Sequence, residues 1–384
     1  MKPRERVMLA LNHKEPDRIP IDLGGTIISS ITKTAYISLK QHLGMPLEEI
    51  TMLDYVQQLP YVDEALMERF GVDFRMVQLP AATAPNLTIF EEGDYYAFID
   101  RWGSKLHMPK DGGLYFDWVD FPIKEATLEA LDRYDWPQPD PQEYHRKLGE
   151  QARYYYENTD YALVGSAVIG GGIFEQPARV MGLENFLMAL VTEPKFADRI
   201  MEQITDIYIE SCNRYLDEVG KYIQVFTYWD DVNTQDGWMI RPEIYKKMIK
   251  PKERRLVEAI KKKTDAKIFF HGCGATFDLI PDLIDLGFDI LNPVQVSARG
   301  MDTRRLKQEY GRDIVFWGGG VDNQHVLPFG TPDEVSEEVK RRIDDLAPGG
   351  GFVFAAVHNI QAFIPPENIC AAFDTALDYG RKGK

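Results

Sequence analysis

The stretch FFHGCGATFDLIPDLIDLGFDILNPVQ, residues 269–295, shows the pattern that decides the fold. An apolar run ends abruptly in His-Gly-Cys-Gly, a helical pattern follows over 276–286, and a second apolar run ends at Asn292-Pro293. Strands that are apolar on both faces and alternate with helices are typical of βαβ units in a parallel sheet. The stretch therefore predicts one strand–helix–strand unit.

The same rhythm continues from residue 161 almost to the C-terminus. The apolar, strand-like runs are YALVGSAV (161–168), YIQVFTYW (222–229), AKIFF (266–270), FDILNPV (288–294), DIVFWGGG (313–320) and GFVFAAV (351–357). Helical patterns separate them at 184–219, 241–263, 276–286, 303–310, 332–346 and 366–381. Six such strands, with one or two more expected earlier, favour a (β/α)8 barrel, the TIM barrel, over an open sheet. The glycine-rich runs lack the spacing of a dinucleotide-binding fingerprint.

The first 150 residues have a less regular pattern. Helical spacing occurs at 3–12, 31–43 and 60–71, and VDFRMV (72–77) reads as a short strand. Alternation around aromatic residues at 95–107 predicts a hairpin. We expect one α/β domain over residues 1–384, in which residues 1–150 form an irregular extension with N-terminal helices and a hairpin at the barrel mouth.

Composition excludes several classes of function. The formal net charge is -16 and the pI is about 5.0, which argues against nucleic acid as a partner because phosphate binding needs a basic face. The three cysteines, Cys212, Cys273 and Cys370, are too few and scattered for a disulfide framework. We find no signal-peptide pattern and no membrane span, and therefore expect a cytoplasmic protein. The sequence leaves the oligomeric state open, with a homodimer as one arrangement.

Polar or glycine residues follow almost every predicted strand. In chain order they are Gly170-Gly171-Gly172 with Glu175, Asp230-Asp231, His271 with Cys273, Asn292 with Gln295, Gly318-Gly319-Gly320 with Asp322, and His358-Asn359. In a barrel these positions converge on the carboxyl-terminal face, where such folds place their chemistry. The sequence therefore predicts a functional site at that face.

His271 and Cys273 are the strongest candidate metal ligands. In extended backbone they project to the same side, roughly 6–7 Å apart at Cα from a rise of about 3.3 Å per residue. Zinc accepts thiolate and imidazole, and its catalytic sites use three protein ligands and one open position. We expect the third ligand to come from another strand end, and His358 is the best candidate.

Simpler readings of these residues remain open. A His-x-Cys pair also arises by chance, and a buried cysteine is usually inert core. Asp230 and Asp231 would also suit the N-terminus of the helix predicted from residue 241. His325 is a weaker alternative ligand. The remaining histidines and cysteines are assigned surface, helix-end or packing roles: His13, His42, His107, His145, Cys212 and Cys370.

Four motifs and the N-terminal stretch resemble the uroporphyrinogen decarboxylase superfamily. They are RERVMLALNHKEPDRIPID (4–22), WDDVNTQDGWMIRPEIYKKMIKPKERRL (229–256), the HGCG stretch, VFWGGGVDNQHVLPFGTPDEV (315–335) and VHNIQAFIPPENI (357–369). The superfamily includes the decarboxylase and corrinoid-dependent methyltransferases, such as the methylcobalamin:coenzyme M enzymes. The resemblance is weakest over residues 25–150 and implies a (β/α)8 barrel.

In the methyltransferase branch, a His-x-Cys pair and a distant cysteine bind zinc. His271 and Cys273 match the pair, and alignment on PPENI places His358 where that branch carries the cysteine. The resemblance thus implies a Zn²⁺ site of His271, Cys273 and His358. It also implies a cobalamin (corrinoid) cofactor carried by a small partner protein, because the chain has no D-x-H-x-x-G corrinoid-binding segment.

We therefore expect a zinc-dependent methyltransferase that moves a methyl group between a small-molecule donor or acceptor and the cobalt of a corrinoid. Asp230, Asp231 and Asn292 are the candidate catalytic residues. The candidate substrate-binding residues are Tyr228, Gln295, Trp317 and Asn359. Candidates for orienting the two imidazoles are Asp230, Asp231, Asn233 and Asn359.

Two alternatives stay open: a metal-free lyase with Asp230 or Asp231 as the acid, and a non-enzymatic binding protein. The decarboxylase itself grips its substrate's carboxylates with an arginine-rich N-terminal loop. The corresponding region here offers Arg18 and then none until Arg69. Instead it is rich in glycine and serine over 24–30, which suggests a loop covering the barrel mouth.

Overall fold

A single parallel sheet organises the protein. The computed structural model describes residues 1–81, 87–166 and 168–381. Within these residues seven strands pair in the order β15-β14-β13-β12-β9-β8-β3, all in parallel. The strands are β3 (Phe74–Val77), β8 (Ala162–Gly165), β9 (Val225–Trp229), β12 (Lys267–His271), β13 (Ile290–Asn292), β14 (Val315–Trp317) and β15 (Phe352–Val353). All six strands predicted after residue 160 are confirmed, as is the one predicted at 72–77.

The segment around Ile21 takes the eighth position and closes the barrel. Ile21 forms a parallel bridge with Phe354, directly after β15. On its other side, the carbonyl oxygen of Ile21 accepts the amide N–H of Asp73, directly before β3, at 2.9 Å. The first and last strands of the sheet are therefore joined, and the predicted (β/α)8 barrel is confirmed.

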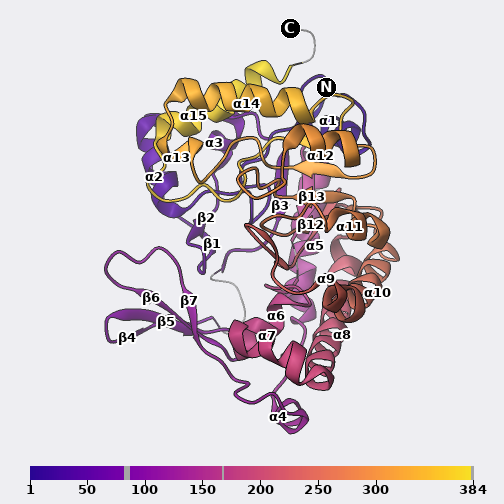
Figure 1. Cartoon of the computed structure of the whole chain (residues 1–384). Coiled ribbons are helices and arrows are strands. Elements are labelled where there is room, and N and C mark those ends of the chain that lie inside the picture. Colours follow the sequence, from indigo (N-terminus) through magenta and orange to yellow (C-terminus); the bar gives the residue numbers. More distant parts are fainter. Residues whose placement is uncertain (82–86, 167, 382–384) are drawn as a thin grey trace.

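Helices follow the strands and surround the barrel (Figure 1). Those between or after barrel strands are α5 (Gln142–Asn158), α6 (Glu175–Met181), α7 (Leu183–Thr192), α8 (Pro194–Val219), α9 (Pro242–Ile244), the π-helical turn η2 (Tyr245–Ile249), α10 (Lys250–Lys261), α11 (Ile280–Leu286), α12 (Thr303–Tyr310), α13 (Val326–Phe329), α14 (Pro332–Leu346) and α15 (Pro366–Tyr379). The predicted 184–219 helix is two helices, because Pro194 starts a new one at its first position, where its missing N–H costs nothing. Across the described ranges, we find no helix with the length and apolarity needed to traverse a bilayer.

The strands separate two apolar cores. Inside the barrel, Phe74, Phe269 and Trp317 pack with Val7 and Leu11 of α1 (Pro3–Leu11), which closes the amino-terminal end. Outside, the alternate residues of the strands pack against the surrounding helices. Both faces of each strand are therefore buried, which explains the continuous apolar runs in the sequence.

A four-stranded antiparallel sheet lies apart from the barrel (Figure 1). It consists of β4 (Phe90–Glu92), β5 (Tyr95–Ile99), β6 (Lys105–Pro109) and β7 (Asp117–Asp120). The predicted hairpin is confirmed as β5 and β6, with Tyr95 opposite Pro109. Side chains of β5 share a cavity with residues that follow β3 and β8, so this sheet flanks the barrel mouth.

The remaining N-terminal elements are short. They are α2 (Lys33–His42), β1 (Met52–Asp54), β2 (Leu59–Pro60), α3 (Glu64–Arg69) and α4 (Leu128–Arg133), with β10 (Asn233–Thr234) and β11 (Gly237–Trp238) forming a small ladder later in the chain. The helix predicted at 60–71 begins only at Glu64. Asp63 caps it by accepting the amide N–H of Leu66 at 2.8 Å, while Pro60 pairs with Met52 in β1–β2.

Candidate metal centre

The barrel register gathers polar residues beside the end of β12. His271, the last residue of this strand, lies opposite Trp229 on β9 and Asn292 on β13. Parallel strands end at the same face of the barrel, so Asp230, Asp231 and Asn292 arrive next to His271. The predicted convergence of polar strand ends is confirmed at these three positions.

The His-Gly-Cys-Gly turn (residues 271–274) needs both of its glycines. A Cβ on Gly272 would lie 2.6 Å from the ring of Phe270. Gly274 has a φ of +98°, and a Cβ there would lie 2.4 Å from the carbonyl oxygen of Thr234. Only glycine accommodates that backbone conformation and that approach without strain. The turn carries Cys273 back over the end of β12.

Three side chains from neighbouring strand ends hold this turn. Asp231 Oδ1 accepts the amide N–H of Cys273 at 2.7 Å, and Gln295 Oε1 accepts that of Gly274 at 2.6 Å. Asn292 Oδ1 lies 2.6 Å from Nδ1 of His271. Three residues predicted to act in catalysis or substrate binding thus fix the backbone or ring of the proposed ligands in this structure.

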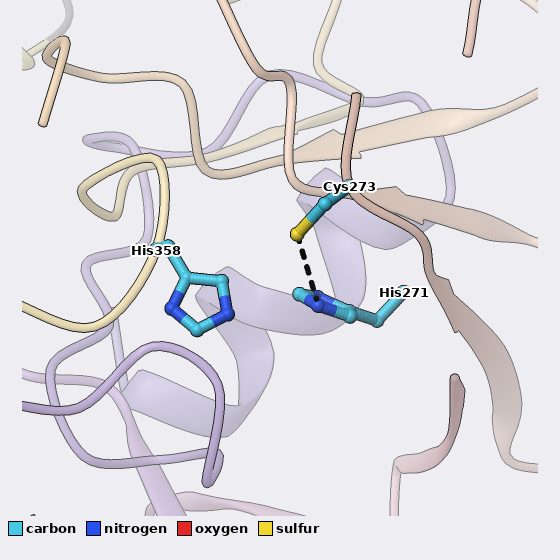
Figure 2. A group of neighbouring side chains, drawn as sticks. All are labelled: His271, Cys273 and His358. Atoms are coloured by element: carbon cyan, nitrogen blue, oxygen red, sulfur yellow. Dashed lines mark hydrogen bonds between the residues drawn. The ribbon is translucent and has the colours of Figure 1, made fainter. Parts of the chain in front are cut away.

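His271, Cys273 and His358 come together at the mouth. One ligand atom from each lies within 4.8 Å of the other two, and Cys273 Sγ is 3.5 Å from His271 Nε2. Figure 2 shows the three side chains converging from β12, the turn after it and the loop after β15. His271 is buried, whereas Cys273 and His358 are partly accessible. The residues present can therefore supply one thiolate and two imidazoles to a single ion.

Hydrogen bonding fixes the tautomer of His271. Asn292 Nδ2 donates to the carbonyl oxygen of Trp317 at 3.0 Å, which leaves Oδ1 to accept the proton of His271 Nδ1. Nε2 of His271 therefore carries the lone pair that faces Cys273. Burial lowers the pKa of His271 to about 4 and raises that of the Cys273 thiol well above its usual range. Without a metal ion, both groups are neutral at pH 7.

His358 has the opposite tautomer in this arrangement. Its Nδ1 accepts the amide N–H of Asn359 at 2.7 Å, so its neutral ring carries the proton on Nε2, the nitrogen turned toward His271 and Cys273 in Figure 2. Burial lowers its pKa to about 3. His358 is thus a hydrogen-bond donor as it stands. Binding an ion through Nε2 requires Nδ1 to take the proton and release the Asn359 amide.

Asp230 caps a helix, although not the expected one. Its two carboxylate oxygens accept the amide N–H groups of Phe174 and Glu175 at 2.8 Å, at the start of α6. Tyr228 donates its hydroxyl proton to the same carboxylate at 3.0 Å. The alternative prediction that Asp230 or Asp231 caps the helix near residue 241 is wrong, because the first turn of α9 has no side-chain cap. Desolvation raises the pKa of buried Asp230 well above its usual range.

The remaining predicted substrate-binding residues are enclosed. Tyr228 and Trp317 are fully buried, and Trp317 Nε1 donates to Asp22 Oδ2 at 2.9 Å. Asn359 accepts the amide N–H of Ser30 at 2.6 Å and donates to the carbonyl oxygen of Ile27 at 3.0 Å. Asn359 thereby holds the glycine- and serine-rich loop. A direct role for these side chains in substrate binding stays a prediction.

The orientation of the imidazoles differs from the expectation. Asn292 orients His271, and the backbone amide of Asn359 contacts His358, whereas Asn233 donates to the carbonyl oxygen of Ala275. Among the described residues, no hydrogen bond joins either imidazole to Asp230, Asp231 or the Asn233 side chain. The parallel register, which places Asn292 opposite His271, is the signal that would have identified the correct partner.

The structure also places two other histidines that were assigned from the sequence, His325 and His145. His325 lies outside the three-residue cluster, with its Nδ1 2.9 Å from Asp322 Oδ2 and its side chain 72% exposed. His145 was predicted to be a surface or helix-end residue, and the helix-end assignment is confirmed: it lies in the first turn of α5, but it is only 1% exposed. It is buried because Tyr215 of neighbouring α8 packs against its ring.

Sequence reasoning missed two charged groups near the mouth. Arg179 of α6 pairs with Glu175 at 2.5 Å and donates to the carbonyl oxygen of Gly170. Asp22, inside the barrel, accepts the amide N–H of Gly25 at 2.8 Å, and desolvation raises its pKa to about 7. Arg179 belongs to no recognisable sequence motif. For Asp22 there was a signal, because it directly follows the apolar Pro-Ile segment that closes the barrel.

Fold and site together define a (β/α)8 barrel with a His-Cys-His donor cluster at its carboxyl-terminal mouth. Residues 94–379 match the model of the uroporphyrinogen decarboxylase (URO-D) family. The chain belongs to this family, as the resemblance in its motifs implied.

Curated relatives and one solved structure extend this placement. A uroporphyrinogen decarboxylase of Geobacter sp. (strain M21) is 25% identical over 195 residues, which cover 50% of this chain and 52% of the relative. That of Syntrophotalea carbinolica is 29% identical over 185 residues, 47% of each chain. The chain thus spans about half the length of these curated relatives. A methyltransferase from Methanosarcina mazei aligns over 99% of both chains, with a TM-score of 0.65 and 15% identity, which shows the shared fold.

Proposed function

We propose that this protein is a zinc-dependent methyltransferase that moves a methyl group between a small molecule and the cobalt of a corrinoid carried by a separate small protein. The observation that supports it most is the cluster of one thiol and two imidazoles, all within 4.8 Å, at the barrel mouth. A barrel mouth that only covered the apolar core would not need a set of metal-ligating side chains. The M. mazei protein, which shares this fold, is itself named a methyltransferase.

The donor set suits zinc in its chemistry. His271 Nε2, Cys273 Sγ and His358 Nε2 would hold the ion, with the proton shift in His358 described above. Zinc commonly takes three nitrogen and sulfur ligands and keeps a fourth position open in catalytic sites. When bound, it would supply a Lewis acid that polarises an oxygen or sulfur atom of the methyl donor or acceptor.

The surrounding residues have their own tasks in this proposal. Asn292 keeps the Nδ1 proton of His271 in place, so Nε2 stays directed at the ligand position. Asp231 and Gln295 fix the peptide on each side of Cys273, which limits the positions its sulfur can take. The partly accessible edges of Cys273 and His358 leave the cluster open to a substrate from the mouth.

The names of the curated relatives favour a second candidate, decarboxylation of a polycarboxylate. Arginine is the residue best suited to grip several carboxylates, because its planar fork binds them in pairs. Here Arg18 is paired with Asp73 at 2.7 Å, directly before β3 and so away from the mouth. Arg179, which does lie at the mouth, is paired with Glu175. These pairings disfavour a many-carboxylate substrate, and we rank the methyltransferase first.

The test is methyl transfer itself, followed by the absorption spectrum of cobalt. Purified protein is mixed with methylated corrinoid protein and candidate thiol or other acceptors, and in the reverse direction with reduced corrinoid protein and methyl donors. We expect a spectral change that depends on the enzyme. Cys273→Ser should abolish this change. Cys370→Ser, at a half-buried position of α15, should leave it intact and serves as the matched cysteine control.

Two results would count against the proposal. One is an unchanged cobalt spectrum with every donor, acceptor and corrinoid partner. The other is equal activity of the Cys273→Ser and Cys370→Ser variants, since the thiolate would then be dispensable.

A further inference from the structure

A cavity of about 610 Å³ lies between the barrel and the antiparallel sheet. It is bounded by residues after β3 and β8, by β5 and by the proline-rich segment 137–141. His271, Cys273 and His358 do not line it. Its volume falls in the range of small-molecule sites. We call it the His145 cavity, after the buried histidine on its wall.

His145 is a buried polar group beside this cavity. Its side chain is 1% exposed, and neither ring nitrogen has a hydrogen-bond partner among the described residues. Burial lowers its pKa, so the ring is neutral. A neutral imidazole offers one donor and one acceptor, and leaving both unmet in a buried position is unfavourable. Both nitrogens are shielded from the cavity, so His145 borders it through other atoms of the residue.

Two carboxyl groups line the same cavity, those of Asp54 and Asp100. Asp54 accepts the amide N–H of Gln57 at 2.6 Å, and Asp100 accepts those of Trp102 and Ser104. Neither carboxyl forms an ion pair within the described ranges of the chain. Desolvation raises the pKa of both.

The arginines nearby are already engaged. Arg101, which also lines the cavity, is paired with Asp140 at 3.1 Å and donates to the carbonyl oxygen of Gln138 at 2.6 Å. Arg179 acts on the two carboxyls only through its field, because its guanidinium is bonded to Glu175 and Gly170. The cavity therefore keeps an excess of negative charge.

Aromatic rings form part of the wall. Tyr144 and Tyr215 lie edge-on to His145, with ring centroids 6.1 and 6.3 Å away, and Phe98 of β5 also faces the cavity. The faces of such rings attract cations, most strongly where water is excluded. Acidic groups and aromatic rings therefore favour the same kind of ligand.

We propose that the His145 cavity binds a small organic cation, a protonated or quaternary amine on an apolar body. Its positive charge would lie toward Asp54 and Asp100, and its body against Tyr144, Tyr215 and Phe98. An anion would meet two uncompensated carboxyls, and a neutral molecule would leave them without a counter-charge.

This site is separate from the donor cluster at the mouth. The two regions approach one another through Gly170, which lines the cavity and whose carbonyl oxygen accepts Trp229 Nε1 at 2.9 Å. Trp229 in turn lies opposite His271 in the sheet register. Because no ligand atom is shared, binding in the cavity does not depend on the proposed methyl transfer.

Three probes of nearly equal shape and different charge test the proposal: 2-phenylethylamine, 2-phenylethanol and phenylacetate. Calorimetric titration of the full chain should give saturable binding of the amine, about tenfold weaker binding of the alcohol and none of phenylacetate. On adding the amine, the ring ¹⁵N signals of His145 should shift. Equal affinity for amine and alcohol, or preferred binding of phenylacetate, would overturn the proposal.

Matched variants locate the binding. Asp54→Asn should weaken amine binding by about tenfold and leave the alcohol unchanged, so that the retained alcohol affinity reports a folded site. Asp117→Asn, at an exposed position of β7, removes the same charge outside the cavity and should have no effect. Cys273→Ser should bind the amine as the unmodified chain does. Loss of amine binding in Cys273→Ser, or its retention in Asp54→Asn, would refute the assignment.

Discussion

The His-Gly-Cys-Gly turn and the His145 cavity differ in how their polar groups are satisfied. In the turn, the side chains of Asp231, Asn292 and Gln295 each accept one hydrogen bond. The candidate metal-ligand atoms are therefore held at fixed positions. In the cavity, both nitrogens of His145 are unmet among the described residues. A satisfied network fixes geometry, whereas an unpaired buried polar group costs stability. The first region is therefore held rigidly, whereas the second keeps an unsatisfied group beside free volume.

The two regions also differ in their sensitivity to substitution. The backbone of the turn depends on close approaches that leave no space for a side chain. The cavity has free volume and carries the cost of an unpaired histidine. Substitutions should thus destabilise the turn and be tolerated, or even stabilising, in the cavity.

The largest effect is expected from Gly274→Ala. The φ of +98° and the approach to the carbonyl oxygen of Thr234 should lower the free energy of unfolding by about 3 kcal/mol and prevent metal binding. Gly112→Ala is the control, because its φ of +67° is also positive but no atom of the described residues lies within 4 Å of the added Cβ. It should cost about 1 kcal/mol. Urea unfolding of both variants makes the comparison, and equal losses would contradict it.

Asn292→Ala should weaken metal binding without removing any proposed ligand. His271 would lose the acceptor that fixes its tautomer, and the loss of such partners typically costs about 10- to 100-fold in metal affinity. Competition with a chromophoric chelator measures the change. Asn158→Ala, at an exposed end of α5, should have no effect. An unchanged affinity in Asn292→Ala would mean that the ring of His271 is oriented by packing alone.

The cavity should reveal itself in the pH dependence of stability. Burial lowers the pKa of His145, so the unfolded chain takes up the proton first, near its usual value of about 6.5. The stability associated with neutral His145 is present above that pH and is lost as the pH falls below it. The unmodified chain should therefore lose more stability between pH 7 and 5 than His145→Phe does. Parallel curves from chemical unfolding would contradict this.

The smallest effect is expected from His145→Phe at pH 7.5. Replacing an unpaired buried imidazole by an apolar ring of similar shape should raise the free energy of unfolding by about 1 kcal/mol in ligand-free protein. Thermal or urea unfolding tests it. A loss of several kcal/mol would show that His145 has a partner after all.

The sequence predicted the turn better than the cavity for physical reasons. His271 and Cys273 are two residues apart at the end of an apolar run, and their convergence with His358 follows from the parallel barrel. The alternation of apolar runs with helical patterns and the residues at strand ends are local signals, and the same signals predicted the barrel strands. Asp54, Asp100, His145 and Tyr215 come from four separate segments, with no shared motif, and their proximity depends on how the N-terminal region packs on the barrel. Tautomers were beyond prediction too, because they depend on single hydrogen bonds such as that from Asn359 to His358.

Metal content of the freshly purified chain tests the central claim most directly. We expect about one zinc ion per chain after gel filtration. Replacement by Co²⁺ should give a thiolate-to-cobalt absorption band that is absent in Cys273→Ser and present in Cys370→Ser. A chain that retains no divalent metal, or a Cys273→Ser variant with the same zinc content and cobalt spectrum, would contradict the account.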